Sequence, residues 1–335
     1  MENQKIDDYL RDGLKDRWYP ICPTSFIADK PVSLRRLGRK LVLWRDERGS
    51  LYCLEDHCPH RGAPLSEGIV LGNTLACRYH GVEVRADGTA TRVPGSPGCK
   101  LEGSRTTASF HVQEIHGYVF LYNHSQPVET PPAMVLPEEL NSSEYEVFPC
   151  YAEWKTDYRL IQDNVMDPMH GTFLHKQTHA MFQGETQAKF QIRDTDHGFI
   201  FEKVDQQNMN FDWSEFGDTS WFWQRLSIPY PREAGPGGHF FIVGSFTPIA
   251  PNLTAVCHWR CRQVEGWQRD AWKFLYKTQL ELRHWEVIEQ DRTLLEKTEP
   301  DASKREILYE HDLGLVRLRR YMRQLAKEQL ASAEG

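Results

Sequence analysis

The chain has 335 residues, of which 40% are hydrophobic and 26% are charged, and its formal net charge is -7. At roughly 100–200 residues per domain, this length predicts about two domains. The mildly acidic balance argues against nucleic acid or an anionic membrane as the main partner. No apolar run approaches the roughly 20 residues of a transmembrane helix, and the acidic, amphipathic start does not resemble a signal peptide.

The eight cysteines are scattered along the chain, which is not the pattern of a disulfide scaffold. We therefore expect a cytoplasmic, reducing location, where clustered Cys and His bind metal more often than they form disulfides.

The first part of the chain predicts one helix and then a small β domain. Residues 1–17 are helical in pattern, and short alternating runs follow between Gly or Asp-Gly turns. The predicted strands cover 32–38, 39–46, 50–56, 88–94, 109–115 and 117–123. We expect an antiparallel β domain over 18–125, followed by a Pro- and Glu-rich linker over 126–140.

The second part, 141–335, predicts an α+β domain with a central sheet and helices against it. Residues 154–182 have a helical period that Pro168 interrupts. The predicted strands then cover 189–194, 198–204, 220–228, 238–249 and 253–264, and two helices cover 266–297 and 303–331.

Four residues of metal-ligand type lie in two tight loops of the β domain. Cys58-Pro-His60 precedes Arg-Gly, and sixteen residues separate His60 from Cys77, which begins Cys77-Arg-Tyr-His80-Gly. Three interpretations compete: buried core residues, a zinc site, or a [2Fe–2S] cluster with two Cys on one iron and two His on the other. Structural zinc sites usually group like ligands, so the alternating order fits zinc poorly. A cluster with neutral imidazoles has a higher potential than an all-Cys ferredoxin.

At these residues the sequence resembles the Rieske family, whose motif is C-x-H…C-x-x-H. The resemblance implies that Cys58 and Cys77 bind one iron and that His60 and His80 bind the other. Many relatives have Trp after the second His-Gly, whereas this chain has Val82. That departure removes no ligand.

A second set of candidate ligands lies around Pro168. Asp163, Asp167 and His170 are spaced i, i+4, i+7 and would share one face of a helix. His175 follows His170 by five residues, which a regular helix would splay by roughly 140°. Pro168 should distort the helix and could bring both imidazoles to one point. Taken alone, this segment favours the simpler interpretation of two histidines near a turn that bind no metal.

Asp291 strengthens the metal interpretation. Val287, Ile288, Leu294 and Leu295 stand at i−4, i−3, i+3 and i+4 from it, so the carboxylate is centred on an apolar stripe. A buried carboxylate needs a charged partner or a metal. Two His and one Asp form the 2-His-1-carboxylate triad of non-haem Fe(II) enzymes.

The order of a Rieske motif, then D-x-x-H-x₄-H, then a distal Asp, resembles the terminal oxygenase component of Rieske non-haem iron oxygenases over essentially the whole chain. The resemblance implies a Rieske domain over 18–125 and a helix-grip-like catalytic domain over 141–335. It also implies that His170, His175 and Asp291 hold a mononuclear Fe(II). Asp167 would bridge a Rieske histidine of a neighbouring subunit to an iron-binding histidine. The likeness is closest to the short members, which include O- and N-demethylases and aromatic hydroxylases and typically form head-to-tail homotrimers.

The resemblance further implies O₂ as co-substrate and a separate electron donor. The chain shows neither a GxGxxG fingerprint nor a C-x₄-C-x₂-C run, so a reductase, with or without a ferredoxin, should deliver NAD(P)H electrons. A basic run could dock an acidic carrier, although a solvated hairpin face is an equal alternative. The run comprises Arg35, Arg36, Arg39 and Lys40, with Arg61 and Arg78.

The expected reaction is hydroxylation or demethylation of a small aromatic compound, with ring cis-dihydroxylation as the alternative and a pure electron-transfer protein or a zinc scaffold as rivals. An aromatic set near the expected pocket suits such a ligand, although most residues of this kind belong to the core more often than to a pocket. The set is Phe182, Phe190, Phe211, Trp213, Trp221, Trp223, Phe240 and Phe241. Arg225 alternates with Trp221 and Trp223, and we expect it to pair with a substrate carboxylate.

Overall fold

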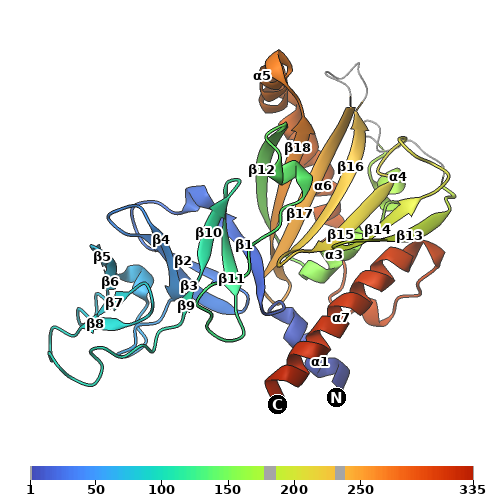
Figure 1. Cartoon of the computed structure of the whole chain (residues 1–335). Helices are drawn as coiled ribbons and strands as arrows, with labels where there is room; N and C mark the ends of the chain where they lie inside the picture. Colours follow the sequence, from blue (N-terminus) through green and yellow to red (C-terminus); the bar gives the residue numbers. More distant parts are fainter. Residues whose placement is uncertain (1, 177–185, 231–237, 335) are drawn as a thin grey trace. The chain divides into compact units, whose positions relative to one another are not determined.

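The computed structural model of the chain describes residues 2–176, 186–230 and 238–334. It divides into two compact units. The first contains 11–132 together with 247–250, and the second contains the remainder. The α+β class is confirmed, since an antiparallel β unit is accompanied by a larger sheet with helices (Figure 1).

The first unit is built from short strands in three sheets. The sheet β1-β11-β10 pairs Arg17–Pro23, Tyr118–Asn123 and Val112–Ile115. The sheet β2-β3-β4-β9 pairs Val32–Arg36, Arg39–Arg45, Leu51–Glu55 and Ser109–Phe110. The sheet β5-β6-β7-β8 pairs Ile69–Leu71, Thr74–Ala76, Glu83–Arg85 and Ala90–Arg92. Short 3-10 turns stand at Thr24–Phe26 and Leu65–Glu67.

One apolar core joins two of these sheets. Trp44 and Leu54 from the second sheet pack with Leu75 and Val84 from the third, and all four side chains are fully buried. Cys58 and Cys77 belong to the same core, so the two motif loops are anchored to it.

The second unit is organised around a seven-stranded sheet in the order β12-β18-β17-β16-β15-β14-β13. These strands are Tyr145–Trp154, Leu253–Gln263, Gly238–Ala250, Phe222–Tyr230, Trp213–Asp218, Gly198–Lys203 and Phe190–Thr195. The helices are α1 Glu2–Arg11, α2 Glu138–Asn141, α3 Tyr158–Val165, α4 His170–Leu174, α5 Gly266–Leu275, α6 Glu281–Leu295 and α7 Leu313–Glu334. Helix α3 contacts both α6 and α7, and α7 packs on β14 (Figure 1).

Three predicted helices differ from the structure. The first ends at Arg11 rather than at residue 17, because Gly13 adopts a φ of +79°, which ends a helix. The predicted helix over 266–297 is interrupted by a π turn at Tyr276–Leu280. The last begins at Leu313 rather than at 303, after 3-10 turns at Ala302–Lys304 and Glu310–Asp312. There the Asp312 carboxylate accepts a hydrogen bond from the Tyr309 amide, which fixes the start of the helix.

The break predicted at Pro168 is confirmed: α3 ends at Val165 and α4 begins at His170. Several strands did not emerge from the sequence pattern, namely β1, β5, β6, β7, β12 and β15. Three of these have only three residues, too few for alternation to be recognisable. In the described part of the chain, no helix is long and apolar enough to cross a bilayer.

Candidate metal centres

The two motif loops of the first unit have the same backbone hydrogen bonds. In the loop after β4, the Cys58 amide donates to Ala63 O at 2.8 Å, and the Gly62 amide donates to Cys58 O at 2.9 Å. In the loop between β6 and β7, the Cys77 amide donates to Val82 O at 2.8 Å and the Gly81 amide to Cys77 O at 2.9 Å. The loops are therefore structural repeats, and each presents one cysteine and one histidine.

The glycine at the fifth position is required in both loops. Gly62 has a φ of +74° and Gly81 a φ of +70°, in the left-handed region that L-residues avoid. A Cβ on Gly62 would lie 2.9 Å from Nε2 of His57. His57 therefore packs over the loop.

The four candidate ligands are arranged as two pairs. Cys58 and Cys77 are buried and adjacent, whereas His60 and His80 are exposed, with ring centroids 4.6 Å apart. A single zinc ion would hold its donor atoms within about 4 Å of one another. Within the described residues, no three of these donors gather within 4.8 Å. The geometry thus disfavours one shared zinc ion.

The metal-free thiol is protonated at neutral pH. Burial raises the pKa of Cys58 to about 11, and its contact with Cys77 adds to the increase, although the His60 and Arg61 amides oppose it. Metal binding at this site would release a proton, as thiolate ligation requires.

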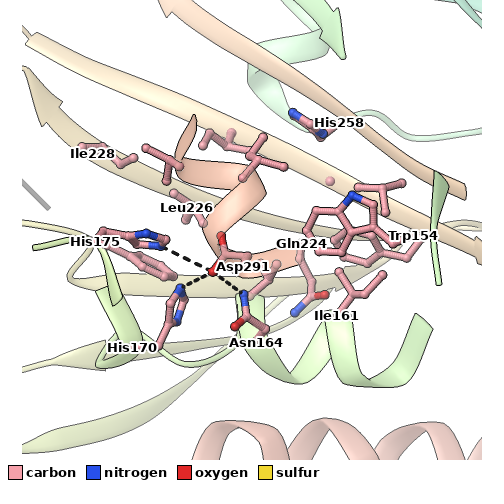
Figure 2. Close-up of a pocket in the computed structure, with 18 residues that line it drawn as sticks. Trp154, Ile161, Asn164, His170, His175, Gln224, Leu226, Ile228, His258 and Asp291 are labelled. Atoms are coloured by element: carbon pink, nitrogen blue, oxygen red, sulfur yellow. Dashed lines mark hydrogen bonds and ion pairs between the residues drawn. The ribbon is translucent and has the colours of Figure 1, made fainter. Parts of the chain in front are cut away.

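The second centre brings together His170, His175 and Asp291. The Asp291 Oδ1 atom lies 3.5 Å from Nε2 of His170 and 3.4 Å from Nε2 of His175 (Figure 2). The two imidazole centroids are 5.3 Å apart. In the described part of the chain, these residues are the one group of three whose ligand atoms all lie within 4.8 Å of one another.

The chain reaches this geometry because the helical backbone is interrupted beside both histidines. His170 is the first residue of α4, and His175 follows its last helical residue with a ψ of 30°. The splay expected for a continuous helix therefore does not apply. Asp291 lies on α6 and is 9% exposed, as its apolar neighbours predict. Leu294 departs from that stripe and is exposed.

Both histidines are held in the tautomer that a metal requires. Nδ1 of His170 donates to Asp167 O at 2.6 Å, and Nδ1 of His175 donates to Oε1 of Gln290 at 2.8 Å. Carbonyl oxygens only accept, so each Nδ1 carries the proton and each Nε2 lone pair faces Asp291. Two lone pairs directed at one carboxylate oxygen need a cation or a proton between them, so the donor set fits a divalent metal.

Two amide side chains complete the centre without any clear signal in the sequence. Asn164 donates to Oδ1 of Asp291 at 3.3 Å, and Gln290 orients His175. Burial alone would lower the pKa of His175, but the Asp291 carboxylate outweighs it and the pKa is raised. The carboxylate therefore favours the protonated form of His175 where no metal is bound.

The other two acids of the segment have different surroundings. Asp163 does not share a face with His170, because the helix breaks between them. It forms a bidentate pair with Arg319 of α7, and burial raises the pKa of Asp163 to about 6 despite this partner. The Asp167 carboxylate accepts from the Met169 amide at 2.7 Å, and its side chain is 31% exposed.

A cavity of about 100 Å³ opens on the triad, with walls from β16, β17, β18, α3 and α6 (Figure 2). Its lining is mostly apolar. The apolar side chains are Trp154, Ile161, Val165, Phe211, Leu226, Ile228, Ile242, Phe246, Val256, Val287 and Ile288. Its polar lining apart from the triad is Asn164, Gln224 and His258.

Most of the aromatic set expected at the pocket lies elsewhere. Phe211 lines the cavity, Phe182 lies outside the described residues, and the other six are not among its lining residues. The expectation for Arg225 is wrong. Its guanidinium donates to Glu215 at 2.5 Å and to Glu139 at 3.0 Å, both buried acids. On β16 the opposite face, with Gln224, Leu226 and Ile228, forms the cavity wall.

The basic run is only partly available at the surface. Arg36 is 3% exposed and donates to Ile21 O and Arg35 O, so it cannot contact a partner. Arg61 and Arg78 are exposed beside the two motif loops, and Arg61 lies over the ring of Tyr79.

Comparison with known proteins identifies both parts of the chain. The family model described as Rieske [2Fe-2S] domain matches residues 17–111, which confirms the Rieske expectation. The model described as vanillate O-demethylase oxygenase C-terminal domain matches residues 154–328.

Curated relatives match about half of the chain. The vanillate O-demethylase oxygenase subunit of Pseudomonas sp. (strain HR199 / DSM 7063) is 34% identical over 161 residues, which cover 48% of this chain and 45% of that protein. The oxygenase component of dicamba O-demethylase from Stenotrophomonas maltophilia is 29% identical over 163 residues, covering 49% and 48%. The matched stretch therefore spans less than half the length of these relatives.

Solved structures share the fold along nearly the whole chain. Dicamba monooxygenase bound to dicamba superposes with a TM-score of 0.74 at 21% identity, covering 95% of this chain and 100% of that one. The terminal oxygenase of carbazole 1,9a-dioxygenase from Nocardioides aromaticivorans IC177 gives a TM-score of 0.75 at 18% identity, covering 98% of each. With its C-terminal half matched by one family model and a Rieske domain before it, the chain belongs to the Rieske non-haem iron oxygenases of the vanillate O-demethylase type.

Proposed function

We propose that this chain is the terminal oxygenase component of a Rieske oxygenase system, which uses O₂ and electrons from a separate NAD(P)H reductase to hydroxylate or O- or N-demethylate a small aromatic substrate. The observation that carries the proposal is the presence of two different ligand sets in one chain. One is a pair of Cys/His loops, and the other is a His170/His175/Asp291 triad at an apolar cavity.

We assign Cys58, His60, Cys77 and His80 to the [2Fe–2S] cluster. The pairing of thiols with thiols and imidazoles with imidazoles supports this assignment, since each iron of such a cluster takes one kind of ligand. The exposed histidines would form the edge through which electrons enter and leave.

We assign His170, His175 and Asp291 to a mononuclear Fe(II). Once bound, this iron supplies the site of oxygen chemistry and the cluster supplies the electrons. The protein's own contribution is to hold both imidazoles in the Nε2-ligating tautomer and to exclude water with apolar walls.

We further propose that Asp167 carries electrons between subunits of a head-to-tail homotrimer. Its carbonyl already contacts the Nδ1 proton of His170, and its carboxylate is partly exposed. We also propose a cytoplasmic location, which the eight free thiols support. We also propose the domain division 18–125, 126–140 and 141–335, and the separate family models at 17–111 and 154–328 support it.

The size of the cavity favours a single-ring substrate. A dry cavity of roughly 150 Å³ is known to hold benzene, so a cavity of about 100 Å³ takes no more than one ring and must widen to do so. The relatives named as O-demethylases make removal of an O-methyl group the preferred reaction, and ring cis-dihydroxylation is the alternative.

The test is turnover with a surrogate reductase. The purified protein, NAD(P)H, reductase and ¹⁸O₂ are incubated with a panel of methoxy- and methylamino-aromatics, and products are identified by mass spectrometry. Formaldehyde with the demethylated product supports the proposal, and a cis-diol with two labelled oxygens supports the alternative. Loss of product in His170→Ala, with the cluster spectrum intact, separates an oxygenase from an electron-transfer protein. Absence of product from every compound, with full iron content, would contradict the proposal.

A further inference from the structure

One end of the cavity carries a histidine that the proposed iron chemistry does not use. His258 on β18 lines the cavity on the side away from His170 (Figure 2). Its side chain is 4% exposed, and its Nε2 atom has no hydrogen-bond partner in the structure. A buried imidazole nitrogen without a partner is costly unless a ligand completes it.

Arg260 stands directly behind this histidine. It follows His258 on the same face of β18 and is 1% exposed. One guanidinium nitrogen donates to the Tyr276 hydroxyl at 2.7 Å, while Nε and the other terminal nitrogen have no partner. Among the residues the structure describes, no carboxylate pairs with Arg260. An ionised group buried in this way lacks its usual compensation.

Two neighbouring side chains hold Arg260 next to the cavity wall. The indole of Trp285 on α6 lies 5.1 Å from the Arg260 guanidinium carbon and 6.0 Å from the His258 ring. Tyr276, which holds Arg260, is the first residue of the π turn between α5 and α6. Such turns are frequent at functional sites, because they aim a side chain that a regular helix would direct elsewhere.

The potential at His258 is positive. Burial lowers the pKa of His258, and the two basic groups that act on the imidazole, Arg260 and His284, lower it further. The ring is therefore neutral at neutral pH, and Arg260 remains the uncompensated cation beside it. An apolar cavity with a buried cation behind one end favours a ligand that has an apolar body and one anionic group.

We propose that His258, backed by Arg260, is the anchoring subsite for a carboxylate on the aromatic substrate. This inference rests on the proposed function, because it names the substrate class of the same cavity. His258 is the specificity-determining residue that contacts the carboxylate, and Arg260 is a positioning residue that supplies the charge. The ring would then occupy the apolar middle of the cavity, with its methoxy group at the triad.

The test compares two ligands of nearly equal shape, 4-methoxybenzoate and 4-methoxybenzamide. Their dissociation constants are measured by anaerobic calorimetry on the iron-loaded, full-length protein. We expect the carboxylate to bind at least about tenfold more tightly than the amide, as for hydrogen bonds to charged groups. We expect Arg260→Gln to reduce this preference to less than about threefold, and Arg260→Lys to retain part of it.

Arg262→Gln is the matched control. Arg262 is equally buried and follows Arg260 on the same face of β18, but it lies over the Trp272 ring, outside the cavity lining. Arg262→Gln should leave the ratio of the two dissociation constants, carboxylate to amide, unchanged. Iron content, cluster absorption and melting temperature show whether each variant is folded.

Equal binding of the two ligands by the wild-type protein, or an unchanged preference in folded Arg260→Gln, would overturn the subsite. If Arg260→Gln does not fold, the wild-type ratio and the Arg260→Lys variant still decide. Demethylation of both compounds with equal efficiency would overturn the subsite but leave the proposed function standing. Carboxylate-selective binding without any product would support the subsite and count against the proposed function.

Discussion

Replacing Gln290 by leucine should weaken iron binding without affecting the cluster. Gln290 Oε1 accepts the Nδ1 proton of His175 at 2.8 Å, and the His175 side chain is 1% exposed. Leucine has a similar size but no acceptor. It therefore leaves a buried donor unsatisfied and frees the imidazole to rotate or change tautomer.

The expected loss is tenfold to a hundredfold in Fe(II) affinity, as for other partners of metal-binding histidines, which corresponds to about 1.4–2.8 kcal/mol. Anaerobic competition with a chromophoric chelator measures the dissociation constant. Visible absorption of the cluster reports whether the rest of the protein is intact.

Two further variants make the result specific. Gln290→Glu keeps an acceptor at the same place and should bind Fe(II) at least as tightly as the wild type. Glu289→Leu changes the neighbouring residue, which pairs with Arg292 at the surface of α6, and should have no effect on iron. Unchanged affinity in Gln290→Leu would refute the view that this hydrogen bond prepares His175 as a ligand.

Four further outcomes follow from the structure. The pKa of His175 is raised, so its proton competes with Fe(II) for the same nitrogen. The dissociation constant for Fe(II) should therefore increase by up to about tenfold per pH unit as the pH falls through that pKa. A dissociation constant that does not change with pH in chelator competition would contradict this. In the iron-free protein, protonated His175 should stabilise the fold at pH values below its unfolded pKa of about 6.5. This stabilisation should be lost as the pH rises through the higher pKa of the folded state, and the free energy of unfolding from urea titration measures it. Arg319→Met should lower the free energy of unfolding by about 2–4 kcal/mol, because it leaves Asp163 buried without its partner, and a loss below about 0.5 kcal/mol would refute this. Charge reversal at Arg61 and Arg78 should slow cluster reduction by the reductase and weaken its salt dependence in stopped flow, and unchanged rates would remove the docking role.

The candidate ligands stand out in the sequence because each is a rare residue, or a charged one at a position where burial is costly. Cys and His at short spacing, and Asp291 beside Val287 and Ile288, have few structural explanations. The proline at 168 predicted a helix break, and the structure has one. The resulting approach of His175 to His170 could not be derived from the sequence, because the backbone conformation at His175 depends on tertiary packing.

The cavity was less predictable because alternate residues of a strand point to opposite faces of the sheet, and only one face lines the cavity. Trp223 and Arg225 on β16, and Trp221 just before it, stood out as large or charged residues. The cavity is instead lined by the other face of β16, with Gln224, Leu226 and Ile228. A strand that is buried on both faces shows no alternation to reveal which face points inward. Gln290 was overlooked for a similar reason, since its role depends on one atom of a residue type common on polar surfaces.

The ratio of iron to acid-labile sulfide in anaerobically purified protein tests the central claim most directly. A [2Fe–2S] cluster and one triad iron predict about three irons to two sulfides in the wild type, and about two to two in His170→Ala. A colourless wild-type protein that contains zinc, or neither iron nor sulfide after reconstitution, would contradict the account.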